Sequence, residues 1–187
     1  MNRRTAVLGI FGIATIVFAG FKFWKIFRKP DLNYLDTKKG LIGEIADTII
    51  PATDTPGAKD VGVEDFILKM VKECTEKKSQ NAFISGLKDL EDYTLKEFSK
   101  NYFDCNGRER IDILTHLENK EELSPIVHKI SKRLFGDSFM YQFKYYAIMG
   151  YCTSEAGSTK AMAYDYIPGT YQACIPLTPH QKCWATQ

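Results

Sequence analysis

Residues 41–58 read LIGEIADTIIPATDTPGA, and this stretch decides the fold class of the chain. Its first ten residues repeat apolar side chains at the spacing of one face of an α-helix. These side chains are Leu41, Ile42, Ile45, Ala46, Ile49 and Ile50. Pro51 lacks the backbone donor that a helix needs, and residues 53–57 (TDTPG) are typical of turns. The stretch therefore predicts an α-helix that ends at Pro51 and leads into a tight turn.

Apolar stripes with the same period recur along the chain. They predict further helices within residues 63–74, 83–98, 106–117 and 124–143. Asn106 is followed three residues later by Glu109, which is the pattern of a helix N-terminus. The last of these helices begins at a Ser-Pro pair, and we expect it to bend or break at Gly136. No long segment alternates as a strand does.

The chain becomes irregular after about Met149, because glycine and proline recur too often for a long helix. This segment is rich in aromatic side chains: Tyr151, Tyr164, Tyr166, Tyr171 and Trp184. Such side chains suit a protein interface, and they suit packing on the chain's own helices equally well. We predict an all-α domain of about five helices with a long irregular C-terminal tail.

Charge divides the chain at Pro30. Residues 1–30 hold six basic and no acidic side chains, whereas residues 31–187 hold 19 basic and 23 acidic ones. The larger part is mildly acidic and has no basic face of the kind that binds nucleic acid. We therefore expect no nucleic-acid partner, and we divide the chain into a leader (1–30) and a helical domain (31–187).

The leader contains an uncharged run at residues 5–21, TAVLGIFGIATIVFAGF. As an N-terminal apolar helix the run would span roughly 25 Å, near the lower limit for a bilayer. Arg3 and Arg4 precede it, as in a twin-arginine export signal, although the aromatic position of that signal is missing. A retained signal anchor is a second interpretation. A cytoplasmic body is a third, since more basic residues follow the run than precede it. We expect export to the periplasm, with membrane association through residues 5–28.

The sequence offers no constellation for catalysis. The three histidines lack metal-ligand spacing, the five cysteines form no CxxC pair, and no glycine-rich phosphate loop occurs. We therefore expect no catalytic, metal or cofactor-binding residue in this chain. Cys152 with Glu155 is a weak nucleophile–base candidate, because the stretch around Ser154 suits helix or turn capping better. Cys174 and Cys183 are the preferred disulfide pair, if one forms.

Three blocks of sequence resemble one family, that of gluconate 2-dehydrogenase subunit 3. The first block is residues 46–58, ADTIIPATDTPGA, followed by Gly-Val at 62–63 and Phe-Ile at 66–67. The later blocks are shorter and hold Gly150, Tyr151, Thr153, Ser154, Glu155 and Gly157, then Tyr164, Tyr166, Pro168, Gly169, Tyr171 and Cys174. The resemblance extends over about residues 37–187.

The resemblance implies a role. Members of the family are small subunits that are thought to stabilise a large flavoprotein of the glucose–methanol–choline (GMC) type and to escort it through export. That partner holds FAD and oxidises a sugar, sugar acid or polyol, and a cytochrome c subunit often takes the electrons. We accordingly expect a non-catalytic subunit. Candidate interface residues are Pro51, Asp54, Pro56, Gly57, Thr153, Ser154, Glu155, Tyr166, Pro168, Gly169 and Tyr171.

Two other interpretations of the sequence remain open. One is a stand-alone membrane-tethered binding or assembly protein without a dehydrogenase. The other is an independent hydrolase or oxidoreductase that uses Cys152 and Glu155. Co-purification from native membranes distinguishes these three interpretations. A dehydrogenase subunit should bring down a flavoprotein, and an assembly protein should bring down a different partner. An independent enzyme should turn over a substrate as the isolated chain.

Overall fold

A computed structural model describes residues 28–121, 131–167, 169–170, 174, 176 and 179–185. The described residues fold as helices and connecting loops, with no strand longer than a single bridge, so the all-α prediction is confirmed. The α-helices are α2 (Leu32–Thr37), α3 (Lys39–Ile49), α4 (Val63–Lys69), α5 (Lys77–Phe98), α6 (Gly107–Glu121) and α8 (Phe139–Thr153). Short turns of 3₁₀- or π-helix are η1 (Met70–Cys74), η2 (Tyr102–Asp104) and η3 (Gly157–Ala161).

The predicted helix ends are reproduced where local chemistry sets them. Helix α3 ends at Ile49, two residues before Pro51. At the start of α6 the Asn106 side chain accepts from the Glu109 amide (2.9 Å), and the Glu109 carboxylate accepts from the Asn106 amide (2.8 Å). This reciprocal pair is a capping box, which satisfies two backbone donors at the helix start.

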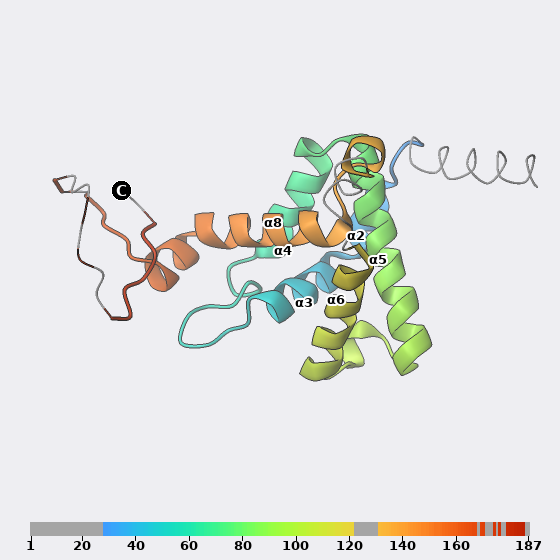
Figure 1. The fold of residues 1–187 in the computed structure, drawn as a ribbon, viewed down its shortest axis with the longest axis horizontal. Helices are drawn as coiled ribbons and strands as arrows, with labels where there is room; N and C mark the ends of the chain where they lie inside the picture. Colours follow the sequence, from blue (N-terminus) through green and yellow to red (C-terminus); the bar gives the residue numbers. More distant parts are fainter. Residues whose placement is uncertain are drawn as a thin grey trace, which may run out of the picture.

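The core lies where α8 crosses α5 and α4, while α3 packs against α4 and α6 (Figure 1). Phe83 of α5 stacks on Phe143 of α8 at 5.9 Å between ring centroids, and Phe139 meets both rings edge-on. Gly86 makes this crossing close, since a Cβ at that position would lie 2.2 Å from the Phe139 side chain. The aromatic cluster ties the two longest apolar stripes into one core.

The expected break at Gly136 is confirmed. This residue has φ of +87° and no room for a side chain beside Ser79, so a helix cannot continue through it. The chain resumes a helical course as α8. The predicted start of this last helix, at the Ser-Pro pair of residues 124–125, lies outside the described residues.

Two expectations about the elements need correction. The domain has more than five helical elements, because α2, η2 and η3 add short ones and η1 extends α4. The irregular tail starts near Met162 rather than Met149, because α8 runs to Thr153 and η3 follows it. The aromatic and small residues near Gly150 pack on α4, and this contact supports helix beyond the point where the sequence pattern loses its period.

The two ends of the molecule differ. In Figure 1 the described chain begins beside α5, whereas the loop between α3 and α4 lies below the left-hand end of α8 and the C-terminal tail lies beyond that end. The predicted apolar leader lies outside the described residues. Among the helices that are described, none is long and apolar enough to cross a bilayer.

Candidate functional site

The loop that joins α3 to α4 carries the first sequence motif. Its exposed tip holds Pro51 and Asp54, and its base holds Gly57 and Ala58, which are buried. The Ala58 amide donates to the Ile50 carbonyl at 2.9 Å, which closes the loop across its neck. At the tip, the Thr53 hydroxyl bonds the Thr55 amide and the Asp54 carboxylate. The turn is therefore held by the Thr53 hydroxyl, and Asp54 is left facing solvent.

Tyr151 of α8 fastens this loop to the helical body. Its hydroxyl donates to the Pro56 carbonyl at 2.7 Å, although the two residues lie 95 positions apart. The next residue, Gly57, donates its amide to the Asp60 carboxylate at 2.9 Å. A Cβ at Gly57 would lie 2.7 Å from the Ala52 amide nitrogen, so the loop backbone packs too tightly there for a side chain. The first and second motifs thus form one unit.

The second motif ends α8. Gly150 lies against the Phe66 ring of α4, and this contact sets how closely the two helices approach. The Ser154 hydroxyl donates to the Tyr151 carbonyl (2.7 Å) and accepts from the Gly157 amide (3.0 Å). The capping interpretation of this stretch is therefore confirmed. Thr153 and Glu155 are exposed beside it.

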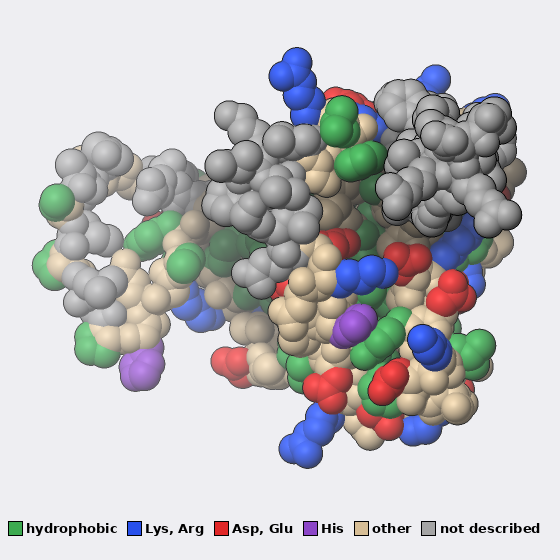
Figure 2. All heavy atoms as spheres, turned by 45° about the vertical axis from the view of Figure 1, so that its right-hand side comes forward, with side chains coloured by type: hydrophobic (Ala, Val, Ile, Leu, Met, Phe, Trp, Pro, Cys, Tyr) green, Lys and Arg blue, Asp and Glu red, His purple; other side chains and the backbone are tan. Residues whose placement is uncertain are grey.

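The C-terminal tail leaves η3 and returns to it. The Ala163 amide donates to the Cys183 carbonyl and the Ala185 amide to the Ala163 carbonyl, both at 2.8 Å, which makes one parallel bridge. Between these points Tyr166 and Ile167 are 87% and 80% exposed. Figure 2 shows apolar side chains among the tail segments at the left, whereas the face of the helical body turned toward the viewer mixes acidic and basic side chains.

Three of the tail's predicted residues stay untested. Gly169 is exposed, and Pro168 and Tyr171 lie outside the described residues. Cys174 and Cys183 are exposed and not bonded to each other in this structure, so their disulfide stays a prediction.

Helix α8 is apolar on two opposite faces. Its inner face is buried and consists of Phe139, Met140, Phe143, Ala147 and Tyr151. Its outer face carries Tyr141, Tyr145 and Ile148, which lie in one stripe and are 49%, 53% and 53% exposed. The first two of these rings stack at 6.2 Å. Large apolar side chains that form an exposed stripe on a helix often mark a contact surface, so the outer face is a candidate for one.

Charged groups also tie the loop to α3. Glu44 of α3 accepts from Lys59 in the loop and from Arg110 of α6 (2.7 Å). The Lys59 ammonium, aided by Arg110, holds the pKa of the Glu44 carboxylate below its usual range. Nearby, burial raises the pKa of Tyr102 to about 12, and its hydroxyl lies 3.0 Å from that of Thr48. This network links α3, α6 and the loop, and it is structural.

The described residues give little basis for chemistry at this end. None of them forms a group of three or more metal-binding side chains. Cys152 is half-buried, and the hydroxyl of Ser154 is engaged in capping. The sequence pattern offers no means of finding the Tyr151–Pro56 bond or the outer stripe of α8, because each depends on how α8 packs.

The described residues define a small all-α protein whose sequence motifs gather at one end of its longest apolar helix. The sequence model of the family described as gluconate 2-dehydrogenase subunit 3 matches residues 36–169, which is most of the chain. The chain belongs to that family, as its motifs predict, and the family is named for one subunit of a dehydrogenase complex. No curated protein and no solved structure shows significant similarity to the chain.

Proposed function

We propose that this chain is the non-catalytic small subunit that binds, stabilises and helps to export an FAD-dependent dehydrogenase of the GMC type, acting on a sugar, sugar acid or polyol. A cytochrome c subunit would complete the complex. The flavin belongs to the large partner, because this chain carries no glycine-rich phosphate loop. Export of the folded pair explains why a single leader, that of residues 1–30, can serve two chains.

The outer stripe of α8 is the observation that carries the proposal. Tyr141, Tyr145 and Ile148 repeat along one face of a helix whose other face already fills the core. Large aromatic side chains supply much of the binding energy at protein interfaces, since they bury a large area with few rotatable bonds. A stripe of this kind on a small acidic body favours a protein partner over a small ligand.

Two neighbouring segments are also exposed. The exposed tip of the loop at residues 51–54 and the aromatic tail at residues 164–167 both lie near the C-terminal end of α8 (Figure 1). We propose that the loop tip and the tail add further contacts to those of the α8 stripe. We expect the interface to bury more than about 2,000 Å², as in permanent complexes.

Substitution of the α8 stripe tests the proposal. Tyr145→Ser with Ile148→Ser should lower the amount of flavoprotein that co-purifies with the tagged small subunit from native membranes by about tenfold or more. Leu95→Ser with Ile111→Ser is the matched control, because these side chains are similarly exposed on α5 and α6. Thermal unfolding should be the same for both variants. Undiminished recovery of the flavoprotein would refute this surface, and recovery of an unrelated partner would support a stand-alone assembly protein.

The export role is tested at the leader. Arg3→Lys with Arg4→Lys should retain both the small subunit and its flavoprotein in the cytoplasm, because the twin-arginine route reads the arginine pair. Cell fractionation locates the small subunit by its tag and the flavoprotein by its flavin fluorescence. Normal export of the flavoprotein beside a retained small subunit would contradict an escort role.

A further inference from the structure

Three segments that are distant in the sequence meet at the end of the body opposite the motifs. Asn81 of α5 donates its side-chain amide to the Arg28 carbonyl (2.8 Å), and Lys78 donates to the Arg133 carbonyl (3.3 Å). A pocket of about 320 Å³ lies between them and is lined in part by Arg28, Lys78 and Phe135. We call residues 28–31, 76–78 and 131–137 the basic end.

The basic end concentrates the positive charge of the protein. It holds Arg28, Lys29, Lys77, Lys78, Lys132 and Arg133 against Asp31, Glu76 and Asp137, for a net charge of +3. The rest of the chain after residue 31 has 15 basic and 20 acidic side chains, for a net charge of −5. Glu76 pairs with Lys78, and Asp137 with Lys132. Within the described residues no carboxylate pairs with Arg28, Lys29, Lys77 or Arg133.

Two large apolar side chains lie among the basic side chains of the basic end. Leu134 and Phe135 follow Lys132 and Arg133 directly and are 49% and 44% exposed. An isolated exposed apolar residue is ordinary, but an exposed pair directly beside a cluster of cations matches the chemistry of a membrane interface. There the cations reach lipid phosphates, and the apolar groups enter the boundary of the acyl chains. Carboxylates do occur farther along the pocket wall, at Asp89 and Asp92.

The position of the leader in the sequence indicates that a lipid surface lies close to the basic end. The uncharged run of residues 5–21 is separated from Arg28 by residues 22–27 alone, and these six residues include two lysines and three aromatic side chains. Six residues reach about 20 Å at most. If the run enters a bilayer, the basic end therefore stays within roughly that distance of the lipid surface.

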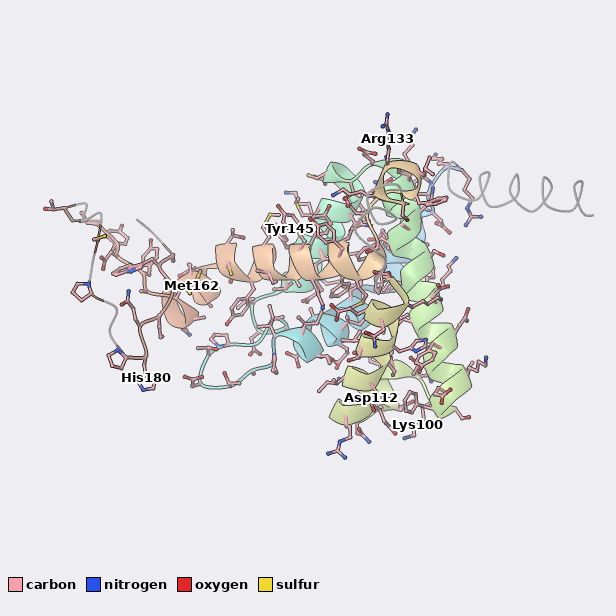
Figure 3. All side chains as sticks on the ribbon, in the orientation of Figure 1. Lys100, Asp112, Arg133, Tyr145, Met162 and His180 are labelled. Atoms are coloured by element: carbon pink, nitrogen blue, oxygen red, sulfur yellow. The ribbon has the colours of Figure 1, made fainter. Side chains whose placement is uncertain are left out.

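We propose that the basic end of the body rests on an anionic membrane surface, with Lys77, Lys78, Lys132 and Arg133 at the phosphates and Leu134 and Phe135 at the acyl boundary. The interaction goes beyond partner binding and does not depend on which protein the motif-bearing end holds. Figure 3 shows Arg133 at the top of the helical body and Lys100 at its bottom, beyond the far end of α5, whereas the tail with Met162 and His180 lies at the left. The subunit would thus stand on the membrane with the tail held away from this contact, while Tyr141 of the α8 stripe borders it, 5.1 Å from the Lys132 ammonium.

Lysine acetylation, followed by mass spectrometry, tests this contact on the full chain. The protein is placed in nanodiscs of phosphatidylcholine alone and of phosphatidylcholine with phosphatidylglycerol. Lys78 and Lys132 should react about fivefold more slowly in the anionic lipid, the effect that one surface-bound basic residue supports. Lys96 and Lys100 should react equally in both lipids, and high salt should remove the difference.

Two pairs of substitutions separate lipid contact from other causes of protection. Lys132→Gln with Arg133→Gln, and separately Leu134→Ser with Phe135→Ser, should each abolish the slow reaction of Lys78 in anionic nanodiscs. Lys96→Gln with Lys100→Gln is the control and should leave it intact, and thermal unfolding verifies that all three variants fold. Equal reaction rates of Lys78 in the two lipids would overturn the proposal. If Lys78 instead reacts slowly in both lipids, protein rather than lipid covers the residue, and the proposal is likewise overturned.

Discussion

At the scale of single residues, Tyr151 links two motifs that the sequence keeps far apart. Its ring is 8% exposed and its hydroxyl satisfies the Pro56 carbonyl at the base of the loop. The loop tip itself has only local hydrogen bonds. The position of the loop relative to α8 therefore depends strongly on one phenol group.

Tyr151→Phe should lower the free energy of unfolding by about 1 kcal/mol, because a half-buried carbonyl loses its donor while the packing of the ring is kept. Tyr145→Phe is the matched control on the same helix, since its hydroxyl has no partner among the described residues. Denaturant unfolding followed by circular dichroism measures both variants. Equal stability of the two variants would show that the hydroxyl does not hold the loop.

Glu121 shows how burial shapes a pH response. This last residue of α6 accepts from the Met140 amide at 3.0 Å and so caps the start of α8. Burial raises the pKa of its carboxyl, and hydrogen bonds from Ser138, Met140 and Phe139 oppose the rise only in part. The folded state therefore holds this proton to a higher pH than the unfolded state does, and Glu121 costs stability as the pH rises through that window.

Glu121→Gln should remove this pH dependence. Relative to the unsubstituted protein, the melting temperature of the variant should rise as the pH increases above the ordinary glutamate pKa of 4.5, because only the carboxylate is penalised by desolvation. Glu97→Gln, at an exposed position of α5, controls for the change in net charge. A melting-temperature difference for Glu121→Gln that stays flat, or that falls with pH, would contradict the assignment.

At the scale of elements, the crossing of α5 and α8 organises the body. Phe83, Phe139 and Phe143 fill the crossing, and Gly86 lets the two helices approach. Glycine inside a helix costs stability relative to alanine, so its presence in α5 indicates a packing requirement. Helix α3 offers a comparison, because a Cβ added at Gly43 would lie 3.8 Å from the Glu64 side chain, an ordinary van der Waals distance.

The two glycines should respond to alanine with opposite sign. Gly86→Ala should destabilise the protein by about 1–3 kcal/mol, because the added methyl forces the Phe139 ring or α8 to move. Gly43→Ala should stabilise it by about 0.5–1 kcal/mol, the gain in helix propensity where space allows. Thermal or denaturant unfolding of both variants measures the contrast, and a stabilising Gly86→Ala would disprove the close crossing.

At the scale of the whole molecule, the two ends are built for different contacts. One end concentrates cations beside the leader, and the other exposes the loop tip and the aromatic tail. Between them the helical body is closed by its own core and by ion pairs of ordinary surface type, which add little stability each. The stability of the subunit therefore comes from the body, and its contacts come from the ends.

The tail should be the first part to open. Chymotrypsin should cut after Tyr164 or Tyr166 well before it cuts α5 or α8, because the described residues of the tail are mostly exposed and lie outside regular helices. In the native complex the same sites should be protected several-fold if the partner covers the tail. Mass spectrometry of the early fragments measures both states, and first cuts within the helices would contradict this order.

The apolar period of residues 41–50, the stop at Pro51, the capping box at Asn106 and the break at Gly136 all follow from the sequence alone, because they depend on neighbours within one or two helical turns. The family follows for a similar reason, since its motifs are runs of adjacent residues. The Tyr151–Pro56 bond, the half-buried position of Glu121, the outer stripe of α8 and the basic end do not. Each joins residues tens of positions apart or depends on which of the two apolar faces of α8 turns toward the core, and packing alone makes that choice.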